Sequence, residues 1–233
     1  MMDKKPDIVY VLKHGGPYEE LRYSLRSIEK NLPHGKVYFY GGMPKHIRPD
    51  VMCELPQYGG TPWAKTTQML YYACRNEALS DDFYLFNDDF FVMKPMERAP
   101  TYANGTIIDL AEEIEKRHGG TTAYTRKMRE TAALLQAEGL PIRNYALHVP
   151  MLINKELARK TIAHFRNGPM FRSLYGNYNE IPARERKDVK IYQLEQKIPK
   201  NPTLLSTNEQ TFAQGKVGQI IREAFPDKSR FEK

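Results

Sequence analysis

The sequence has few cysteines and no long apolar run near its amino terminus. Its 233 residues include two cysteines, Cys53 and Cys74, which are too few for a disulfide framework or a cysteine-based zinc site and fit a reducing compartment. The first apolar run, residues 7–12, is too short for a signal peptide or a membrane span. We therefore expect a cytoplasmic protein without a membrane span.

The sequence also has no internal repeat, no low-complexity segment and no long basic arm. Its 35 Lys and Arg outnumber its 28 Asp and Glu, which gives a net charge of +7 spread along the chain. Such a balance attracts polyanions such as nucleic acid, anionic lipid or nucleotide phosphates, although spare surface lysines explain it equally well. The 41% of apolar residues are enough to bury the core of one large domain.

The apolar pattern alternates between strands and helices. Residues 7–12 and 36–42 are typical of buried strands, and residues 18–33 between them have apolar side chains at helical spacing. This order predicts parallel strands joined by a crossover helix. A short strand over 49–56, a helix over 64–79 and a strand ending at Phe86 follow. We therefore expect an α/β fold of the nucleotide-binding kind, with a sheet flanked by helices.

Residues 101–140 differ from this pattern because they are charged and helical, with a break at Gly119 and Gly120. We interpret them as a helical insertion within a single domain that spans residues 1–233. Three further elements are predicted beyond the insertion: a strand and helix over 145–165, a strand over 188–194 and a helix over 206–225.

A polar triplet, Asn87-Asp88-Asp89, interrupts two apolar runs. At a strand's carboxyl end, such oxygen ligands suit Mg²⁺ or Mn²⁺ held jointly with phosphate oxygens. Alternation along an extended chain would place Asn87 and Asp89 on one face and Asp88 on the other. A turn that caps a hairpin explains the same residues. The apolar flanks favour the cation site, because uncompensated carboxylates there are costly.

Three segments resemble the Stealth-type capsular polysaccharide phosphotransferases. They are residues 18–44, residues 79–95 (LSDDFYLFNDDFFVMKP) and residues 147–156 (LHVPMLINKE). Stealth proteins in turn resemble the GT-A class of nucleotide-sugar glycosyltransferases, in which a DxD motif at a strand end holds Mn²⁺ or Mg²⁺ on the donor diphosphate. The resemblance thus implies a GT-A-like, Rossmann-like mixed sheet.

The chain departs from the Stealth pattern in two places. It opens with DIVYVLKHGG where Stealth proteins have DVVYTWVDG, and Asn87 replaces the first acidic residue of the motif. The different opening, together with a chain shorter than a typical Stealth protein, indicates a smaller GT-A relative, and Asn87 leaves the motif with fewer negative charges for a metal ion. Compact basic glycosyltransferases of this kind resemble those of phages that modify DNA bases, and a phage-encoded protein would act in the host cytoplasm.

The resemblance implies a site for a nucleotide-sugar donor and a Mn²⁺ or Mg²⁺ ion. Candidate metal ligands are Asn87, Asp89 and His148. Candidate donor-binding residues are Lys13, His14, Gly15, Arg22, Gly41, Gly42, Lys65 and Asp88. Among these, Lys65 is also favoured by its place at a helix start, where backbone N–H groups bind phosphate. Ordinary turns, surface cations and a hydrogen-bonded core histidine are the alternatives.

Two carboxylates are candidates for the catalytic base. Inverting transfer needs a base within hydrogen-bond reach of the acceptor hydroxyl, and Asp88 and Glu209 are the candidates, whereas retaining transfer needs none in that place. Glu209 also suits the first turn of a helix. The sequence does not choose between the two stereochemical outcomes.

The basic residues of the helical segment, Arg126, Lys127 and Arg129, are candidates for binding a polyanionic acceptor, such as DNA with a hydroxymethylated pyrimidine flipped from its stack. Two alternatives to sugar transfer remain. One is a Stealth-like sugar-phosphate transferase that acts on a polysaccharide. The other is a basic nucleic-acid-binding protein without activity.

Overall fold

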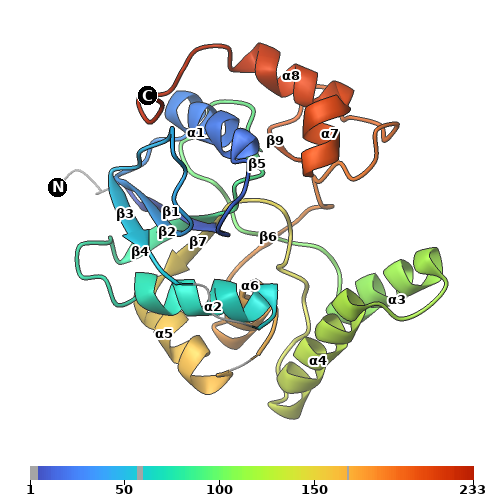
Figure 1. The fold of residues 1–233 in the computed structure, drawn as a ribbon. Helices are drawn as coiled ribbons and strands as arrows, with labels where there is room; N and C mark the ends of the chain where they lie inside the picture. Colours follow the sequence, from blue (N-terminus) through green and yellow to red (C-terminus); the bar gives the residue numbers. More distant parts are fainter. Residues whose placement is uncertain (1–4, 57–59, 167) are drawn as a thin grey trace.

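The computed structural model describes residues 5–56, 60–166 and 168–233 (Figure 1). At its centre is a five-stranded sheet with the order β3-β2-β1-β4-β7. Its strands are β1 (Asp7–Leu12), β2 (Val37–Gly41), β3 (Val51–Glu54), β4 (Asp82–Phe86) and β7 (Met151–Asn154). β3, β2, β1 and β4 are parallel to one another, and β7 pairs antiparallel with β4. The expected mixed α/β sheet flanked by helices is confirmed.

Successive residues of β1 point to opposite faces of the sheet and belong to two separate hydrophobic cores. Ile8 and Tyr10 pack with α1 (Glu19–Asn31) on one face, whereas Val9 packs on the other face, which is covered by three helices. These helices are α2 (Pro62–Ala73), α5 (Lys155–His164) and α6 (Phe171–Tyr178). Burial on both faces explains why the parallel strands appear in the sequence as nearly continuous apolar runs.

The strand order reverses at β1. The chain runs outward from β1 through β2 to β3 and then returns to place β4 on the other side of β1. The carboxyl ends of β1 and β4 are therefore neighbours with Tyr10 opposite Phe86. Such a reversal leaves a crevice above the strand ends, where ligands bind in open α/β sheets.

The polar triplet lies where the chain leaves one sheet for another. β4 ends at Phe86, and β5 (Phe90–Val92) pairs antiparallel with β9 (Leu204–Ser206) in a separate two-stranded sheet. β4 and β5 therefore do not form a hairpin with each other, and the hairpin interpretation of the triplet is wrong. The two apolar runs are buried strands of different sheets, and the polar residues lie at the crossing between them.

Two predicted elements near the carboxyl terminus differ from the structure. Residues 188–194 form no strand and make a single β-bridge, between Lys190 and Ser206. The pairing does not continue because the chain turns after Ile191, where the Tyr192 N–H donates a hydrogen bond to Gln196 Oε1. The predicted helix over 206–225 is two helices, α7 (Glu209–Gln214) and α8 (Lys216–Ala224), separated by extended backbone at Gly215.

The predicted helical segment forms a helical hairpin that projects from the body of the molecule (Figure 1). It consists of α3 (Ile107–His118) and α4 (Ala123–Ala137), which pack on each other and, through the same hydrophobic cluster, on Phe165, Met170 and Leu174. Two short strands close its base, β6 (Tyr102–Ala103) and β8 (Arg184–Glu185). The division into one domain with an insertion over 101–140 stays a prediction. Within the described ranges, no helix has the length and apolarity needed to cross a membrane.

Candidate functional site

A pocket of about 690 Å³, which we call the main pocket, opens above the ends of β1 and β4. Six of the residues that the sequence singled out line it: Lys13, Lys65, Asn87, Asp88, Asp89 and Glu209. They come from the loop after β1, the first turn of α2, the triplet after β4 and the start of α7. The fold therefore gathers cations and carboxylates from four distant segments at the crevice that the strand order creates.

Asp89 is the most buried acid of the main pocket, with 8% of the residue exposed. Its Oδ2 accepts hydrogen bonds from Lys190 Nζ at 2.6 Å and from Ser206 Oγ at 3.3 Å. Its Oδ1 is buried and has no hydrogen-bond partner among the described residues. A buried carboxylate oxygen without a partner is costly, so this oxygen is an open ligand position for a hard cation.

The protein offers a cation only part of a coordination shell. Among the residues that the structure describes, no three His, Cys, Asp or Glu side chains cluster as a ready metal site. Asp88 and Asp89 both line the main pocket, in contrast to the predicted separation of Asp88 from its neighbours, because the triplet turns instead of continuing as a strand. Two carboxylates fit Mg²⁺ or Mn²⁺, which complete their shells with water and substrate phosphate.

Two carboxyl groups of the main pocket, Asp88 and Glu20, have a raised pKa. Burial, reinforced by the charge of Asp89, raises the pKa of Asp88 to about 6. Burial also raises the pKa of Glu20 to about 7, although a hydrogen bond from the Thr207 hydroxyl opposes the shift. Burial therefore disfavours the ionised form of both carboxyl groups, and a bound cation would favour it.

The raised pKa of Glu20 predicts a pH-dependent cost to stability. Its carboxyl binds a proton more tightly in the folded state than in the unfolded chain, so stability falls as the pH rises from about 4.5 towards 7. We expect Glu20→Gln to raise the free energy of unfolding by about 1–3 kcal/mol at pH 8 and to change it little at pH 4. Denaturant titrations at both pH values measure this difference, and an equal effect at both would contradict the assignment.

A second pocket, of about 200 Å³, adjoins the main pocket and shares Thr66 and Asn87 with it. His148 lines it, and its Nδ1 lies 2.7 Å from Asp188 Oδ2. Burial alone would raise the pKa of Asp188, but the hydrogen bonds from His148 outweigh it and lower the pKa. An ionised Asp188 holds the proton on Nδ1 and leaves Nε2 as an acceptor.

Arg172 brings an unpaired cation to the second pocket. Its guanidinium donates to the carbonyl oxygens of Val149 and Leu85 and lies 5.2 Å from the centre of the Phe90 ring. Burial lowers the pKa of this group to about 10, so it stays charged at neutral pH. Within the described ranges it forms no ion pair with a carboxylate, although the charges of Asp89 and Asp188 favour its charged form.

Several predicted donor-binding residues lie outside both pockets. Arg22 is held by Glu19 at 2.9 Å and by Glu232 at 3.1 Å, so its charge is already compensated. The ring of His14 is hydrogen-bonded with the Leu55 carbonyl oxygen at 2.8 Å, and Gly15 adopts a φ of 69° in the loop after β1.

Gly41 and Gly42 hold the loop after β1 in position rather than line either pocket. Gly41 has a φ of 105° at the end of β2. A Cβ atom on Gly42 would overlap with the Tyr18 hydroxyl and the Lys13 carbonyl oxygen, two atoms that are themselves hydrogen-bonded at 2.6 Å. Both glycines therefore permit the close approach that places Lys13 at the main pocket.

We expect Gly42→Ala to displace the loop after β1. The Lys13 carbonyl belongs to the backbone and cannot rotate away, so the substitution should cost about 1–3 kcal/mol of stability, as overpacking does. Thermal unfolding measures this cost. No left-handed φ adds to this cost at Gly42, so the loss measures the overlap alone. A Gly42→Ala variant as stable as the original protein would contradict a role for close packing at Gly42.

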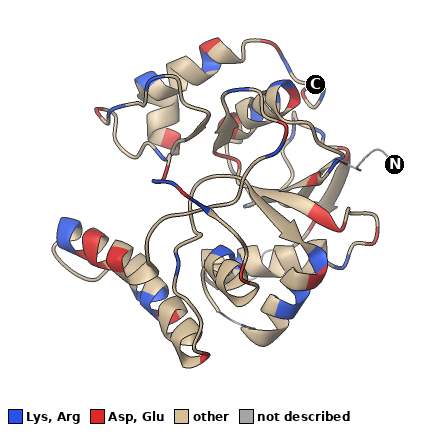
Figure 2. Ribbon diagram, turned by 180° about the vertical axis from the view of Figure 1, so that it is seen from behind, with Lys and Arg blue, Asp and Glu red and all other residues tan. Residues whose placement is uncertain are grey.

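The predicted acceptor-binding cations lie on α4, away from both pockets. Lys127 pairs with Glu130 at 2.5 Å and Arg129 with Glu115 at 2.6 Å, whereas Arg126 is exposed. Figure 2 shows residues of both signs along this hairpin. Their role in acceptor binding stays a prediction, and local pairing leaves less positive charge there than the sequence indicates.

The structure adds four charged residues that the sequence analysis did not select: Glu20, Arg172, Asp188 and Lys190. Lys190 is 101 residues from Asp89 along the chain, and Asp188 is 40 residues from His148. Both lie in the segment that was predicted to be a strand, and nothing in the neighbouring sequence indicates that their charges belong to the site. Glu20 was indistinguishable from an ordinary acid in the first turn of a helix.

No protein-family model matches the chain, and a search of curated proteins finds no match. Among solved structures, the apo form of the glycosyltransferase GlyE from Streptococcus pneumoniae TIGR4 is similar, with a TM-score of 0.47 and 11% identity over 97% of this chain and 61% of that chain. Another crystal structure of GlyE gives a TM-score of 0.37 and 10% identity over 90% of this chain and 46% of that chain. The chain thus spans less than two thirds of GlyE, and so distant a likeness carries no inference about activity.

Proposed function

We propose that the chain is a glycosyltransferase that binds a nucleotide-sugar donor in the main pocket and transfers the sugar to a hydroxyl acceptor in the second pocket. The observation that carries this proposal is the position of Asn87-Asp88-Asp89 at the crossing between two sheets, above the point where the strand order reverses. A volume of about 690 Å³ lies within the usual range for pockets that bind small molecules.

The charges of the main pocket suit a diphosphate. Lys65 lies in the first turn of α2, which Thr61 caps and Pro62 begins, so the helix dipole adds to the lysine charge. Lys13 supplies a second cation from the loop after β1. These side chains would hold the phosphates, and Asp88 and Asp89 would repel them unless a cation lay between.

Mn²⁺ or Mg²⁺ fits that position. Asp89, through its unpartnered Oδ1, and Asp88 would hold it, and the bound ion would act as a Lewis acid that neutralises the departing diphosphate. Lys190 binds the other oxygen of Asp89 and compensates part of the carboxylate charge. A bound cation would therefore balance the carboxylate charge that Lys190 leaves unpaired.

The second pocket supplies a base for the acceptor. In sugar transfer, the acceptor oxygen bonds to the anomeric carbon, the bond from that carbon to the diphosphate oxygen breaks, and the acceptor proton must be removed. We assign this proton to Nε2 of His148 rather than to Asp88 or Glu209. His148 lies beside Asn87 in the adjoining pocket, whereas both carboxylates line the pocket assigned to the donor.

One observation favours a second candidate, sugar-phosphate transfer. The unpaired charge of Arg172 in the second pocket suits a phosphoryl group that passes between the two pockets. In that reaction the acceptor oxygen bonds to the β-phosphorus, and the bond between the β-phosphorus and the bridging oxygen breaks. The product is then a nucleoside monophosphate, whereas sugar transfer releases a nucleoside diphosphate.

The products of donor breakdown test both candidates. The protein would be incubated with a panel of nucleotide sugars and Mn²⁺, with and without DNA that contains hydroxymethylated pyrimidines, the acceptor that the sequence analysis suggested. We expect slow hydrolysis of one donor to its nucleoside diphosphate and faster release when the acceptor is present. Release of the monophosphate would favour sugar-phosphate transfer. If no donor breaks down and none binds, neither transferase proposal holds.

A further inference from the structure

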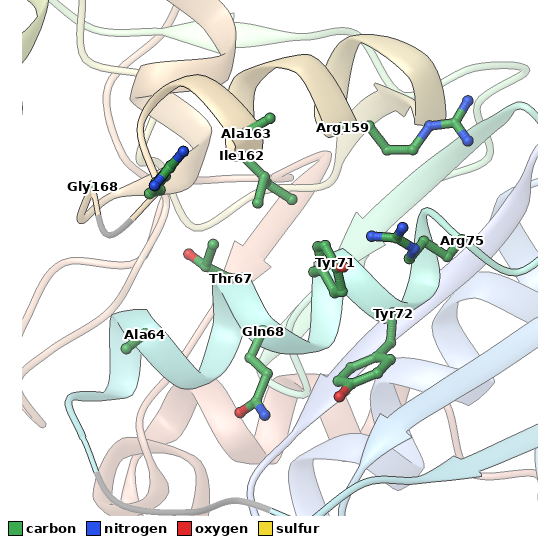
Figure 3. A pocket seen from close by; sticks show the side chains of 11 residues that line it. Ala64, Thr67, Gln68, Tyr71, Tyr72, Arg75, Arg159, Ile162, Ala163 and Gly168 are labelled. Carbon is green, nitrogen blue, oxygen red and sulfur yellow. The ribbon is translucent and has the colours of Figure 1, made fainter.

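A groove of about 680 Å³ lies between α2 and α5 (Figure 3). It uses a different face of α2 from the one that lines the main pocket. Lys65 and Met69 line the main pocket. Ala64, Gln68 and Tyr71, which follow one another at helical spacing, line the groove. The same helix therefore forms a wall of both cavities, and the groove is separate from the site described above.

Two exposed tyrosines are the main feature of the groove. Tyr71 is 40% exposed and Tyr72 is 45% exposed, and their rings meet edge to face with centroids 5.6 Å apart. The Arg75 guanidinium lies 4.4 Å from the centre of the Tyr71 ring. Figure 3 shows Tyr71 on α2 and Arg75 just beyond the end of that helix, with Arg159 on α5 nearby. Aromatic rings left open to solvent beside guanidinium groups form a surface on which a flat group can stack.

The charged residues that line the groove are all positive. Arg75, Arg159 and Arg166 line it, and no acidic residue does so among the described residues. None of the three arginines forms an ion pair with a carboxylate in the described part of the chain, whereas Lys127 and Arg129 on α4 are both paired. This surface therefore offers an anion more available charge than the paired cations of α4.

Aromatic rings combined with unpaired arginines are the chemistry of single-strand recognition. Every base has a flat face that stacks on tyrosine, and the backbone phosphates accept from guanidinium groups. A duplex hides those faces. A lipid surface favours an apolar face rich in Trp, Phe and Leu, and none of these lines the groove among the described residues. Single-stranded nucleic acid fits these features better than either alternative.

We propose that the groove binds a segment of single-stranded nucleic acid, with bases stacked on Tyr71 and Tyr72 and phosphates held by Arg75 and Arg159. If the bound strand is the acceptor of the transfer reaction, this role of the groove rests on the proposed transferase activity. Binding of the strand itself does not depend on that activity. Strand binding measured without donor and donor hydrolysis measured without strand can therefore fail separately.

Fluorescence anisotropy with a labelled decathymidylate measures the binding. We expect Tyr71→Ala/Tyr72→Ala to weaken binding by about tenfold or more, since each stacked base contributes appreciably. Tyr71→Phe/Tyr72→Phe retains the rings and should bind nearly as the original protein does. We expect Arg75→Ala/Arg159→Ala to reduce the slope of log affinity against log salt by about 1.4, or about 0.7 for each lost phosphate contact.

Matched ligands and variants make the outcome decisive. Lys197→Ala/Lys200→Ala removes the same formal charge from exposed positions in the loop before β9 and should change binding much less than the groove variant does. An abasic strand of equal length keeps the phosphates and should bind more weakly. The proposal is overturned if the original protein does not bind decathymidylate, if the tyrosine variant binds as well as the original, or if duplex DNA, an abasic strand or anionic vesicles bind equally well. Melting temperatures confirm that the variants are folded.

Discussion

Asp89→Asn is expected to reduce turnover of the nucleotide-sugar donor by about 10²–10³-fold, the scale seen when one group that stabilises transition-state charge is removed. Asp89 offers the unpartnered buried oxygen of the main pocket, and an amide in its place loses the charge that would hold a divalent cation. Most of the loss should appear in kcat, because the cation neutralises charge that develops as the donor breaks down. Steady-state release of nucleotide with saturating Mn²⁺ measures the change.

Lys190, which forms the ion pair with Asp89, provides the control for stability. Asp89→Asn leaves the Lys190 ammonium, which is 14% exposed, without its carboxylate, and breaking such a pair costs about 3 kcal/mol when it is well buried. Asp89→Asn/Lys190→Met removes both charges and should recover most of that stability while activity stays low. If the double variant regains the original turnover, the loss in the single variant reflects misfolding, and Asp89 has no role in the reaction.

The second large effect is expected at His148. His148→Asn should lower transfer to the acceptor by about 10²–10⁴-fold, the usual contribution of a general base. The dissociation constant for the donor should change little, because His148 lines the second pocket and not the main one. Product formation with a saturating acceptor and equilibrium binding of the donor measure the two quantities. A large loss of donor affinity would instead indicate that His148 holds the cation, as the sequence analysis predicted.

We propose that Asp188 positions His148, and its substitution separates the role of a base from that of a metal ligand. Asp188→Asn removes the anion that holds the proton on Nδ1, so kcat should fall while the KM for donor stays the same. Asp188→Glu keeps the charge and should restore part of the rate. If both variants behave like the original protein, the hydrogen bond between Asp188 and His148 has no part in catalysis.

The sequence predicts the sheet well because each strand carries its own signal. The apolar runs at β1, β2 and β4 are buried on both faces, and burial of this kind leaves a local pattern. The bounds of such strands follow from turn residues beside them, as with Gly41 at the end of β2. By contrast, residues 188–194 have an apolar pattern without a strand partner along their length, and pairing depends on neighbours that the pattern does not reveal.

The site was only partly predictable, because its charges are compensated from far along the chain. The triplet is visible in the sequence since polar residues interrupt two apolar runs. Nothing local indicates that Lys190 reaches Asp89 or that Glu232, 210 residues away, holds Arg22. Arg22 therefore looked like a phosphate ligand and Lys190 did not, while the contacts in the structure place Lys190, and not Arg22, at the main pocket.

The most direct test of the central claim is a crystal structure with an unhydrolysed donor analogue and Mn²⁺, measured at an X-ray wavelength where manganese scatters anomalously. We predict an anomalous peak between Asp89 Oδ1 and the donor diphosphate, with the phosphates near Lys13 and Lys65. A diphosphate bound away from the triplet, or bound at the triplet with no manganese beside Asp89, would contradict the account.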